Sequence, residues 1–580
     1  MRIEEEPLTG KKILLILLPF WTPLIPPLGI SCLKGFLQQR GMTIKTVDAN
    51  VEMEFVQIYD GYLNSLKKYI PRENRGNFFN IGIDVLQNHL DAYFNYVYGK
   101  QTGNGEDDGQ YVELLKQVIS RTFFHRVDDA AVQDLDGFIA EFYLRLEFYL
   151  DRLMVEETPD VLGISVYKGT FAPSLFAFKR VKEHYPSVKT VMGGGIFSDQ
   201  LALGSPNFDA FLEKTPYIDT VIVGEGELLF LKLLKGELPP SHRVYTRETL
   251  NGEVLDVSTA PVPDFSDFDT GYYSALPAYS SRSCPFQCGF CAETVNWGKY
   301  RKKSARRVAE ELNRLYETYG GQLFLMCDSL LNPIVADLAR ELSGSETVLY
   351  WDGYLRVDKM ARDIENTLSW RRGGFYRARL GIESGSDRIL TLMDKKITTA
   401  GIRESLSNLA HAGIKTSTYW VVGYPGETEA DFRETLALIE RLKDDIYEAE
   451  ANPFRFYPMG QVKSGEWAGS GTAALLYPPP AKELLTLQTW FLEDVAPSRE
   501  EIYSRLSRFV AHCKKLGVPN PYSWQEINAA DERWKKLHLN AVPPLMAFKD
   551  RETYLDECRS VENLLLLEET EDAEGDFDFG

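Results

Sequence analysis

The sequence predicts an α/β protein with three folded parts. These are an N-terminal doubly wound, Rossmann-like domain with a helical insertion, a partial TIM-type (β/α)6 barrel, and a mostly helical C-terminal region. Two stretches in which apolar strand patterns alternate with helix patterns indicate two parallel sheets. A helical stretch without strand rhythm interrupts the first series. The length of 580 residues is too great for one hydrophobic core.

An apolar run opens the first series. Residues 13–18 read as a buried parallel strand, followed by a proline-rich loop, a helix over 28–39 and a strand over 43–47. The alternation stops at about 51 and resumes after 157, with strands at 161–167, 190–192 and 220–223 and a helix at 172–184. We therefore expect a five-stranded domain made of residues 1–50 and 158–255, with residues 51–157 as a helical insertion.

Residues 13–33 are apolar enough to raise another interpretation, a membrane-spanning helix or a signal peptide. Four prolines break any helix there, and three glutamates stand where a signal peptide carries basic residues. These are Pro19, Pro23, Pro26 and Pro27, and Glu4, Glu5 and Glu6. A strand, a proline loop and a helix fit the segment better.

The second series indicates a barrel over residues 275–460, whose working face is its carboxyl-end loops. Its strands are expected just before Cys284 and at 323–327, 348–351, 376–382, 416–422 and 454–457. Helix caps support the pattern, because Ser304 precedes an apolar stripe and Thr428 forms a capping box with Asp431. Residues 461–565 read as mostly helical, and we expect residues 566–580 to be an acidic, disordered tail.

The charge balance excludes some classes of partner. Lys and Arg number 64 against 84 Asp and Glu, which gives a net charge of −20. Such a surface repels phosphate backbones and anionic lipids, so we expect neither a nucleic acid nor a membrane partner. Seven cysteines are sparse in this length, and three of them fall within eight positions. This clustering is typical of metal binding in a reducing, cytoplasmic compartment.

Cys284, Cys288 and Cys291 form a CxxxCxxC triplet in a loop after a predicted strand. Three thiolates at this spacing can each bind one iron of a 4Fe–4S cube and leave the fourth iron open. The alternatives are a structural zinc site, for which Cys327 is the one plausible fourth ligand, and three unrelated thiols. The spacing and the strand-end position favour iron–sulfur binding.

The segment SRSCPFQCGFCAET resembles the signature of the radical S-adenosylmethionine (AdoMet, SAM) superfamily. The resemblance implies that AdoMet chelates the open iron, that the reduced cluster breaks its carbon–sulfur bond, and that the resulting radical removes hydrogen from an unactivated carbon. The protein then contributes positioning, electron supply and the exclusion of water and oxygen. No acid–base pair stands out, so no catalytic side chain is assigned.

Two further stretches resemble the same superfamily, and together the match covers residues 275–460. Glu383 and Ser384 lie in the stretch GIESGS, where relatives hold the ribose and methionine parts of AdoMet. A helix-capping carboxylate is the alternative for Glu383. Gly423 and Pro425 lie in the stretch GYPGET, where relatives contact the adenine with backbone groups.

Three more AdoMet contacts follow from the resemblance. Phe290 stands where relatives place an apolar residue beside the adenine. Asp328 and Ser329 end the second barrel strand and correspond to a position that faces the AdoMet amino group, although a Gly-Gly-Glu motif is absent.

The N-terminal domain resembles the cobalamin-binding domain of cobalamin-dependent radical AdoMet enzymes. Its proline loop, the loop after its third strand and two glycine-rich turns fall where that family lines its cobalamin. The residues are Thr22, Pro26, Ser165, Thr170, Gly193, Gly194, Gly195, Gly224 and Glu225. Glycines let the backbone approach a flat macrocycle, and hydroxyl groups supply hydrogen bonds; a plain turn is the alternative for each glycine run. The Asp-x-His-x-x-Gly motif of other cobalamin proteins is missing, as is usual in the radical relatives.

The resemblance leads to two hypotheses about the reaction. The first is a cobalamin-dependent radical AdoMet C-methyltransferase that acts on a peptide or natural-product intermediate. The second is a cyclase or rearrangement enzyme, with cobalamin a spectator or absent. A third hypothesis, a non-catalytic electron-transfer protein, leaves the AdoMet-like motifs unexplained. A methylthiotransferase is disfavoured because it needs a second cysteine cluster, and Cys32 alone precedes the triplet.

The sequence says less about the substrate and the partners. Residues 297–301 (WGKYR) and 327–332 (CDSLLN) resemble cobalamin–radical enzymes that modify ribosomally made peptides. We expect the insertion and the region after 460 to shape the site for a peptide or small-molecule substrate. A reductant such as flavodoxin or ferredoxin is the expected protein partner.

Overall fold

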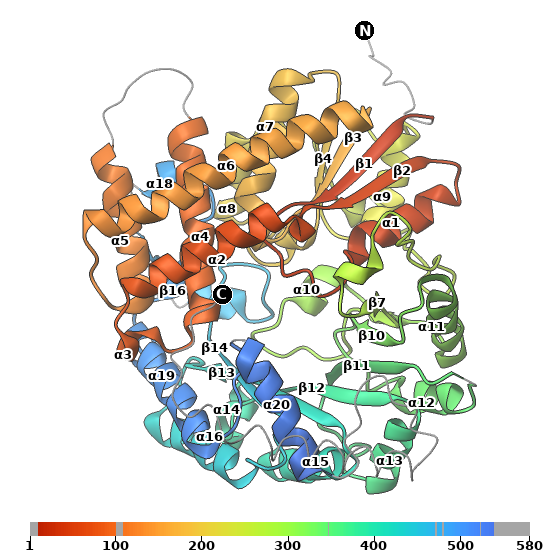
Figure 1. Ribbon diagram of the computed structural model, residues 1–580, viewed down its shortest axis with the longest axis vertical. Helices are drawn as coiled ribbons and strands as arrows, with labels where there is room; N and C mark the ends of the chain where they lie inside the picture. The colour runs from red at the N-terminus through yellow and green to blue at the C-terminus, as the bar shows by residue number, and fades with distance from the viewer. Residues whose placement is uncertain are drawn as a thin grey trace.

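Two parallel sheets organise the chain (Figure 1). The computed structural model describes residues 10–99, 108–345, 347–469, 473–477, 481–522 and 524–538. The predicted acidic tail at 566–580 and the last part of the predicted 461–565 region lie outside the described residues. In Figure 1 the N-terminal sheet lies at one end of the molecule and the barrel sheet at the other.

The N-terminal sheet has six parallel strands in the order β2-β1-β3-β4-β5-β6. Because β1 pairs with β2 on one side and with β3 on the other, the topology switches beside β1. Ligands of doubly wound sheets bind beyond the carboxyl ends of the strands at such a point. The strands are β1 (Lys12–Leu17), β2 (Thr43–Asp48), β3 (Val161–Ser165), β4 (Lys189–Gly193), β5 (Thr220–Ile222) and β6 (Val244–Tyr245). The sequence predicts the first five and misses β6, which has two residues in a polar stretch.

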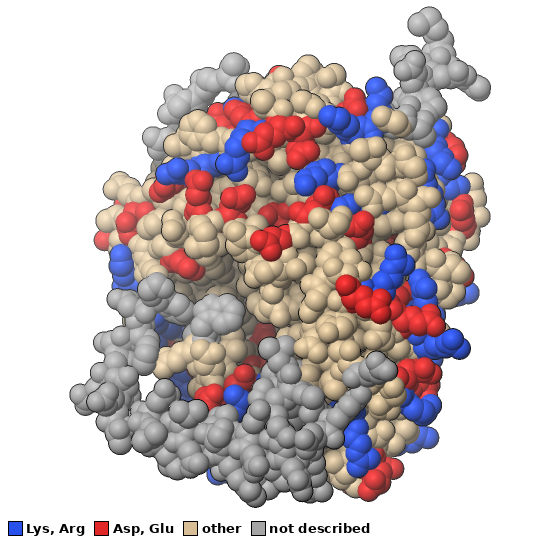
Figure 2. All heavy atoms as spheres, turned by 45° about the vertical axis from the view of Figure 1, so that its right-hand side comes forward, with Lys and Arg blue, Asp and Glu red and all other residues tan. Residues whose placement is uncertain are grey.

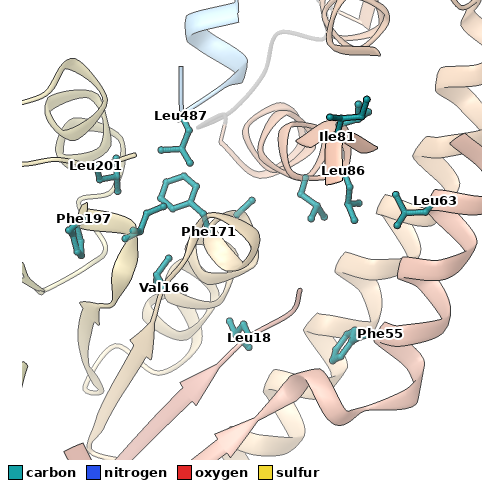
Figure 3. Close-up of a cluster of buried hydrophobic side chains, with 14 of the residues drawn as sticks. Leu18, Phe55, Leu63, Ile81, Leu86, Val166, Phe171, Phe197, Leu201 and Leu487 are labelled. Atoms are coloured by element: carbon teal, nitrogen blue, oxygen red, sulfur yellow. The ribbon is translucent and has the colours of Figure 1, made fainter. Parts of the chain in front are cut away.

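Successive side chains of the central strands point to opposite faces of this sheet. Ile13 and Leu15 pack into a core with α1 (Leu28–Gln38) and α9 (Gly226–Leu234). Leu14 and Ile16 point the other way, into a larger core shared with the insertion and with the helices α7 (Phe171–His184) and α8 (Pro206–Lys214). Figure 3 shows part of this second core, between the sheet and the insertion helices. Residues 13–33 thus form a strand, a loop and a helix, as predicted.

The insertion after β2 is helical, as predicted. Its helices are α2 (Met53–Lys68), α3 (Arg72–Arg75), α4 (Phe78–Tyr93), α5 (Asp108–Phe123) and α6 (Asp129–Glu157), with a π-helical turn at Phe94–Tyr98. Tyr62, Phe142 and Tyr143 are fully buried. These aromatic side chains of the insertion form core, which is the usual role of large apolar residues.

The second sheet is the predicted partial barrel, six parallel strands in the order β7-β10-β11-β12-β13-β14. The strands are β7 (Leu276–Ala278), β10 (Leu323–Met326), β11 (Tyr350–Leu355), β12 (Phe375–Glu383), β13 (Lys415–Val422) and β14 (Glu448–Pro453). Its helices are α11 (Ala305–Tyr319), α12 (Val335–Ser343), α13 (Ile364–Arg372), α14 (Asp387–Leu392), α15 (Thr399–His411) and α16 (Glu429–Arg441). Both predicted caps are present, Ser304 on α11 and the Thr428–Asp431 capping box on α16.

The sixth barrel strand corrects the prediction of a strand at 454–457. The strand is β14, six residues earlier, and it pairs with β13 from Glu448 to Pro453. Its sequence EAEANP consists of residue types with low β-propensity, so pairing with β13 rather than local preference creates the strand. The apolar residues at 454–457 instead form the loop at its carboxyl end. The third strand, β11, also runs four residues beyond its predicted end.

The C-terminal region is mostly helical where the structure describes it. It contains α17 (Ser464–Gly469), α18 (Ala481–Leu484), α19 (Arg499–Leu516) and α20 (Trp524–Leu537), together with a hairpin of β15 (Ala473–Leu475) and β16 (Trp490–Leu492). Of the helices in the described ranges, none is both long and apolar enough to cross a membrane.

One carboxylate joins three parts of the chain. Asp84 of α4 accepts hydrogen bonds from Lys168 Nζ at 2.5 Å and from Arg455 Nη1 and Nη2 at 2.9 and 2.6 Å. Lys168 follows β3 of the N-terminal sheet, and Arg455 follows β14 of the barrel. Burial alone would raise the pKa of Asp84, but the two cations outweigh it and hold the pKa well below its usual range.

Replacing Asp84 with alanine should therefore destabilise the protein. The change leaves Lys168 and Arg455 close together without their shared counter-ion, which we expect to cost about 3 kcal/mol. The measurement is the urea midpoint of the apoprotein at pH 7. Asp337→Ala is the matched control, because Asp337 pairs with Arg340 at 2.9 Å on the exposed surface of α12. Its loss should cost no more than about 0.5 kcal/mol, and equal effects of the two variants would contradict the prediction.

Candidate functional site

The three cysteines lie in one loop at the carboxyl edge of the barrel sheet. The loop leaves β7 through the first strand of a small hairpin, β8 (Ser281–Arg282) and β9 (Arg301–Lys302), and contains α10 (Glu293–Trp297). Cys288 is buried, Cys284 and Cys291 are half-buried, and none of the three is in a disulfide. The N–H of Gly289 donates to the carbonyl of Met393, and the carbonyl of Gly289 accepts from Lys463, each at 2.9 Å. The loop is thereby fixed against the end of α14.

Arg356 presents a buried positive charge to this loop. Its side chain is 7% exposed, and Nη1 lies 3.7 Å from Cys288 Sγ. The guanidinium also sits 4.1 Å from the centre of the Phe286 ring, inside the cysteine loop. Nη2 is buried and has no hydrogen-bond partner in the described part of the chain. A buried, unpartnered guanidinium nitrogen is costly, which indicates that an anionic group belongs beside it.

The donor chemistry of the loop fits a metal cluster. Burial, together with the neighbouring charges of Glu293, Cys288 and Cys284, raises the pKa of the Cys291 thiol to about 12. Such thiols ionise when a metal cation compensates the charge. Within the described residues no group of three His, Cys, Asp or Glu side chains is already arranged around a metal position. The case for the cluster therefore rests on the three thiols of one loop and on Arg356.

Asp328 is fully engaged with the strand that leads to the cysteines. This carboxylate is 1% exposed and accepts hydrogen bonds from Ser280 N at 2.9 and 3.0 Å, from Ser280 Oγ at 2.7 Å and from Ser281 Oγ at 2.5 Å. Ser329 donates to Glu293 of the cysteine loop at 2.5 Å. Both residues therefore tie the end of β10 to the loop, while their contact with AdoMet stays a prediction.

Glu383 and Ser384 lie at the end of β12, and Glu383 shares a neighbour with Phe290. Glu383 has a positive φ of 64° and pairs with Lys395 at 2.6 Å, both side chains being nearly buried. Lys395 Nζ also lies 5.8 Å from the centre of the Phe290 ring, so Phe290 and Glu383 share a neighbour. Ser384 Oγ accepts from the backbone N–H of Ser386 at 3.2 Å. The structure thus connects Glu383 to the cysteine loop through Lys395, while Ser384 contacts Ser386 and Thr435.

Gly423 and Pro425 lie in a loop that is held by a buried glutamate. The backbone N–H of Gly423 donates to Glu427 Oε2 at 2.9 Å, and Arg505 of α19 donates to the same oxygen at 3.0 Å. Glu427 is 3% exposed. Gly423 has a φ of 82°, and a Cβ there would meet the Ile502 side chain at 2.2 Å, so a glycine is required. Burial raises the pKa of Glu427 to about 7, despite both hydrogen bonds.

Glu427→Gln should change the pH dependence of stability. Because the pKa of Glu427 is raised from 4.5 in the folded protein, this carboxyl favours the folded state most at low pH, and its contribution is lost as the pH rises through about 7. Glutamine stays neutral. Between pH 5 and pH 8 the variant should therefore gain roughly 2–3 kcal/mol relative to the wild type, measured by urea unfolding. A constant difference between the two proteins at all pH values would contradict the prediction.

A cavity of about 700 Å³ lies between the carboxyl edge of the N-terminal sheet and the first strands of the barrel. Seven of the nine residues predicted to line cobalamin line this cavity. They are Pro26, Ser165, Gly193, Gly194, Gly195, Gly224 and Glu225. Trp21 and Tyr167 form part of the wall with ring centres 4.7 Å apart. A cavity of this size and mostly apolar lining is typical of a cofactor site.

Thr22 and Thr170 are the two predicted residues outside the cavity lining. Thr22 is exposed. Thr170 is fully buried, and its hydroxyl accepts from the backbone N–H of Tyr167 at 3.0 Å, which closes a short helical turn. The Gly194 backbone has a φ of 112° and packs so closely that a Cβ would meet the Val166 N at 2.3 Å. This glycine is therefore required by the packing of the turn.

Glu225 also takes part in an ionic connection between the two sheets. Its carboxylate pairs with Arg282 at 3.3 Å and with Arg301, which come from the hairpin that flanks the cysteine loop. Glu227, from the same turn, pairs with Arg282 as well, and both side chains are largely buried. Because burial is compensated by these arginines, the pKa of Glu227 falls below its usual value. The connection links the wall of the large cavity directly to the segment before Cys284.

Several residues of the site carry no signal in the sequence. On the barrel side of the large cavity, Trp297 and Cys327 belong to stretches already singled out by resemblance, whereas Tyr279, Asn296 and Tyr354 do not. These residues reach the cavity because the two sheets face each other, and no local motif reports that packing. Arg356 follows β11, and its position at a strand end is the one indication that its side chain reaches the working face.

Comparison with known proteins places the site in a family context. Residues 279–439 match the model of the radical SAM superfamily. Over 334 residues the chain is 25% identical to the anaerobic magnesium-protoporphyrin IX monomethyl ester cyclase of Cereibacter sphaeroides, a match that covers 53% of each protein. Over 314 residues it is 26% identical to TokK of Streptomyces tokunonensis, a cobalamin-dependent radical SAM methyltransferase, covering 48% of this chain and 44% of TokK. The chain thus spans about half the length of these curated relatives.

Among solved structures, the radical SAM methyltransferase TsrM from Kitasatospora setae aligns over 95% of this chain and 100% of its own, with a TM-score of 0.58 and 14% identity. One TsrM structure holds cobalamin and a [4Fe-4S] cluster, and another holds a tryptophan substrate and a SAM analogue. At this level of identity the likeness shows a shared fold of the whole chain.

Proposed function

The chain contains a radical SAM domain, and we propose that it is an enzyme that binds a 4Fe–4S cluster through Cys284, Cys288 and Cys291 and cleaves AdoMet there. The observation that carries the proposal is a buried Arg356 nitrogen, without a hydrogen-bond partner among the described residues, beside a loop of three thiols at the carboxyl edge of a partial barrel. When bound, the cluster supplies the electron for reductive cleavage of AdoMet, and a cobalamin carries a methyl group to the substrate.

The large cavity supports a cobalamin-dependent C-methyltransferase. It lies at the switch point of the N-terminal sheet and opens toward the barrel residues Cys327 and Asp328. TokK, which is similar to this chain in sequence, and TsrM, which is similar to it in fold, are both named as methyltransferases. A methyl carrier in this cavity and AdoMet at the cysteine loop would both face the same interior space. The substrate is a peptide or a small molecule, and its carbon is unactivated.

The side chains of the site position and enclose the reactants. Arg356 would neutralise negative charge beside Cys288, and Phe290 would cover the adenine. Glu383, already paired with Lys395, would accept hydrogen bonds from the ribose. The Glu225–Arg301 and Glu227–Arg282 pairs would keep the cavity wall in register with the cysteine loop and help to exclude water.

A second function has specific support. In sequence, the Cereibacter cyclase matches 53% of this chain, compared with 48% for the methyltransferase TokK. Ring formation would use the same cleavage of AdoMet without methyl transfer. Product mass separates the two, because methylation adds one methylene unit to the substrate and ring closure adds none.

Spent AdoMet tests the proposal without a known substrate. The full chain is reconstituted anaerobically with iron, sulfide and hydroxocobalamin and is then supplied with AdoMet and reduced flavodoxin. The appearance of both 5′-deoxyadenosine and S-adenosylhomocysteine supports the methyltransferase. 5′-Deoxyadenosine alone would favour the cyclase. The absence of both products would refute radical AdoMet chemistry altogether.

A bulky residue at Gly29 tests the place of cobalamin. Gly29 lies on α1 in the cavity wall, and a Cβ there would meet only the Tyr167 hydroxyl at 3.9 Å. Gly29→Trp should fill the cavity and reduce cobalamin uptake by at least about tenfold, measured from the visible spectrum after desalting. Gly137→Trp is the matched control, since Gly137 is helical, exposed and has open space at its Cβ, away from the cavity. Equal cobalamin uptake by the two variants would show that cobalamin does not bind in this cavity.

A further inference from the structure

A second cavity, of about 130 Å³, lies where the insertion, the barrel and the C-terminal region meet. One side is formed by Gly423 and Pro425, the loop predicted to contact AdoMet. Aromatic side chains of the barrel end and of the C-terminal region form much of the remaining wall. These include Phe454, Tyr457, Tyr477, Trp490 and Tyr503. Such a lining suits a ligand with an apolar body and a few polar groups.

Positive charge gathers in this cavity although the whole chain has a net charge of −20. The cations Lys168, Arg455 and Arg499 line it together with two carboxyls, Asp84 and Asp199. Lys168 and Arg455 share Asp84 as their counter-ion. Burial raises the pKa of Asp199 and lowers the pKa of Lys168. The surface of the molecule differs, since acidic and basic side chains are interspersed over the face shown in Figure 2.

Of these three cations, Arg499 is the one without an acidic partner in the described part of the chain. Its Nη2 donates to the carbonyl of Arg121 at 3.1 Å, and its guanidinium lies 5.5 to 6.0 Å from the ring centres of Phe124, Phe491 and Tyr503. Among the described residues no carboxylate is within ion-pair distance of it. Arg508, on the same helix, shows the contrast, because it pairs with Glu429 at 2.7 Å.

Arg499 also lies at the amino end of its helix. Arg499 is the first residue of α19, after the N-cap Ser498. The amino end of a helix carries a partial positive charge, which favours anions and disfavours an arginine. Glu500 and Glu501 lie in the same first turn, and Glu501 forms a capping box with Ser498, so the charge of the helix end is already balanced. The guanidinium of Arg499, rather than the helix end, is therefore the group that is available to an anion here.

We propose that this cavity binds a carboxylate of the substrate and that Arg499 is its direct partner. The inference rests on the proposed function and narrows its substrate class to molecules that carry a carboxylate. The carboxylate is either a chain end or an acidic side chain within a peptide. The planar guanidinium can bind it through two parallel hydrogen bonds. The rest of the substrate then follows the aromatic wall toward the Gly423 loop.

Binding of model carboxylates tests the proposal without turnover. The reconstituted full chain is titrated calorimetrically with two pairs of probes, each pair differing by one carboxylate. N-acetyl-L-phenylalanine and its amide represent a chain end; the α-amide of N-acetyl-L-glutamate and N-acetyl-L-glutaminamide represent an acidic side chain. We expect at least one acid to bind about tenfold more tightly than its neutral partner. The pair that shows the preference identifies the source of the carboxylate.

Variants of two arginines on one helix make the test specific. Arg499→Gln should reduce the preference for the acid to less than about twofold, whereas Arg508→Gln should leave it unchanged. No preference in either pair, no saturable binding of either acid, or an intact preference in Arg499→Gln would each overturn the proposal. Because no reductant is present, these results are independent of whether AdoMet is cleaved.

Discussion

Replacing any one of Cys284, Cys288 and Cys291 with alanine is expected to abolish reductive cleavage of AdoMet. Each thiolate would bind one iron, so the loss of one leaves an incomplete cluster that neither holds AdoMet at an open iron nor transfers an electron to it. We expect the rate of 5′-deoxyadenosine formation to fall by at least about a thousandfold, equivalent to ~4 kcal/mol in the activation free energy. Chromatography of the nucleoside products under anaerobic conditions provides the measurement.

The remaining thiols supply the controls for this experiment. Cys327 is exposed at the end of β10, and Cys513 is fully buried in α19. Cys327→Ala and Cys513→Ala should each reconstitute with the same iron content as the wild type. A loss of metal in Cys327→Ala, equal to that in the triplet variants, would instead indicate a four-thiol site such as structural zinc.

Replacing Arg356 with glutamine is expected to lower the reduction potential of the cluster. The buried guanidinium lies 3.7 Å from Cys288 Sγ, and a positive charge there stabilises the reduced, more negative state. We expect a decrease on the order of tens of millivolts and a decrease in AdoMet cleavage of about 10- to 100-fold. Redox titration monitored by electron paramagnetic resonance measures the potential.

The fold of the variant should survive, which keeps this prediction specific. The backbone of Arg356 is held at both its N–H and its carbonyl by the side-chain amide of Asn332, at 2.8 Å each. Arg356→Lys should recover part of the potential because it restores the charge. Arg340→Gln, on the exposed face of α12, should change nothing. A wild-type potential in Arg356→Gln would exclude an electrostatic role for this residue.

Strong local patterns explain why most of the fold was predictable. The run at residues 13–18 reads as a buried strand because both of its faces are covered, one by α1 and α9 and the other by the insertion. Strand β14 was misplaced for the opposite reason. Its alternating Glu and Ala have little preference for a strand, and the strand exists because β13 pairs with it.

The residues of the candidate site also divide into those that the sequence predicts and those that it does not. The cysteine triplet and the glycine turns follow from sequence, since a metal loop and a close backbone approach need those residue types at those spacings. Arg356, Lys395 and Arg499 do not, because their roles depend on which strands and helices meet in space. Asp328 is a third case. Its position at a strand end was predictable, but the Ser280 and Ser281 hydrogen bonds that engage it were not.

The central claim is that one iron of a three-thiolate cluster stays open for AdoMet. Mössbauer spectroscopy of protein reconstituted anaerobically with ⁵⁷Fe and sulfide tests it most directly, with spectra taken before and after AdoMet is added. We predict a 4Fe–4S spectrum in which AdoMet changes the isomer shift of a single iron site. Identical spectra with and without AdoMet, or a metal ion with four protein ligands, would contradict the account.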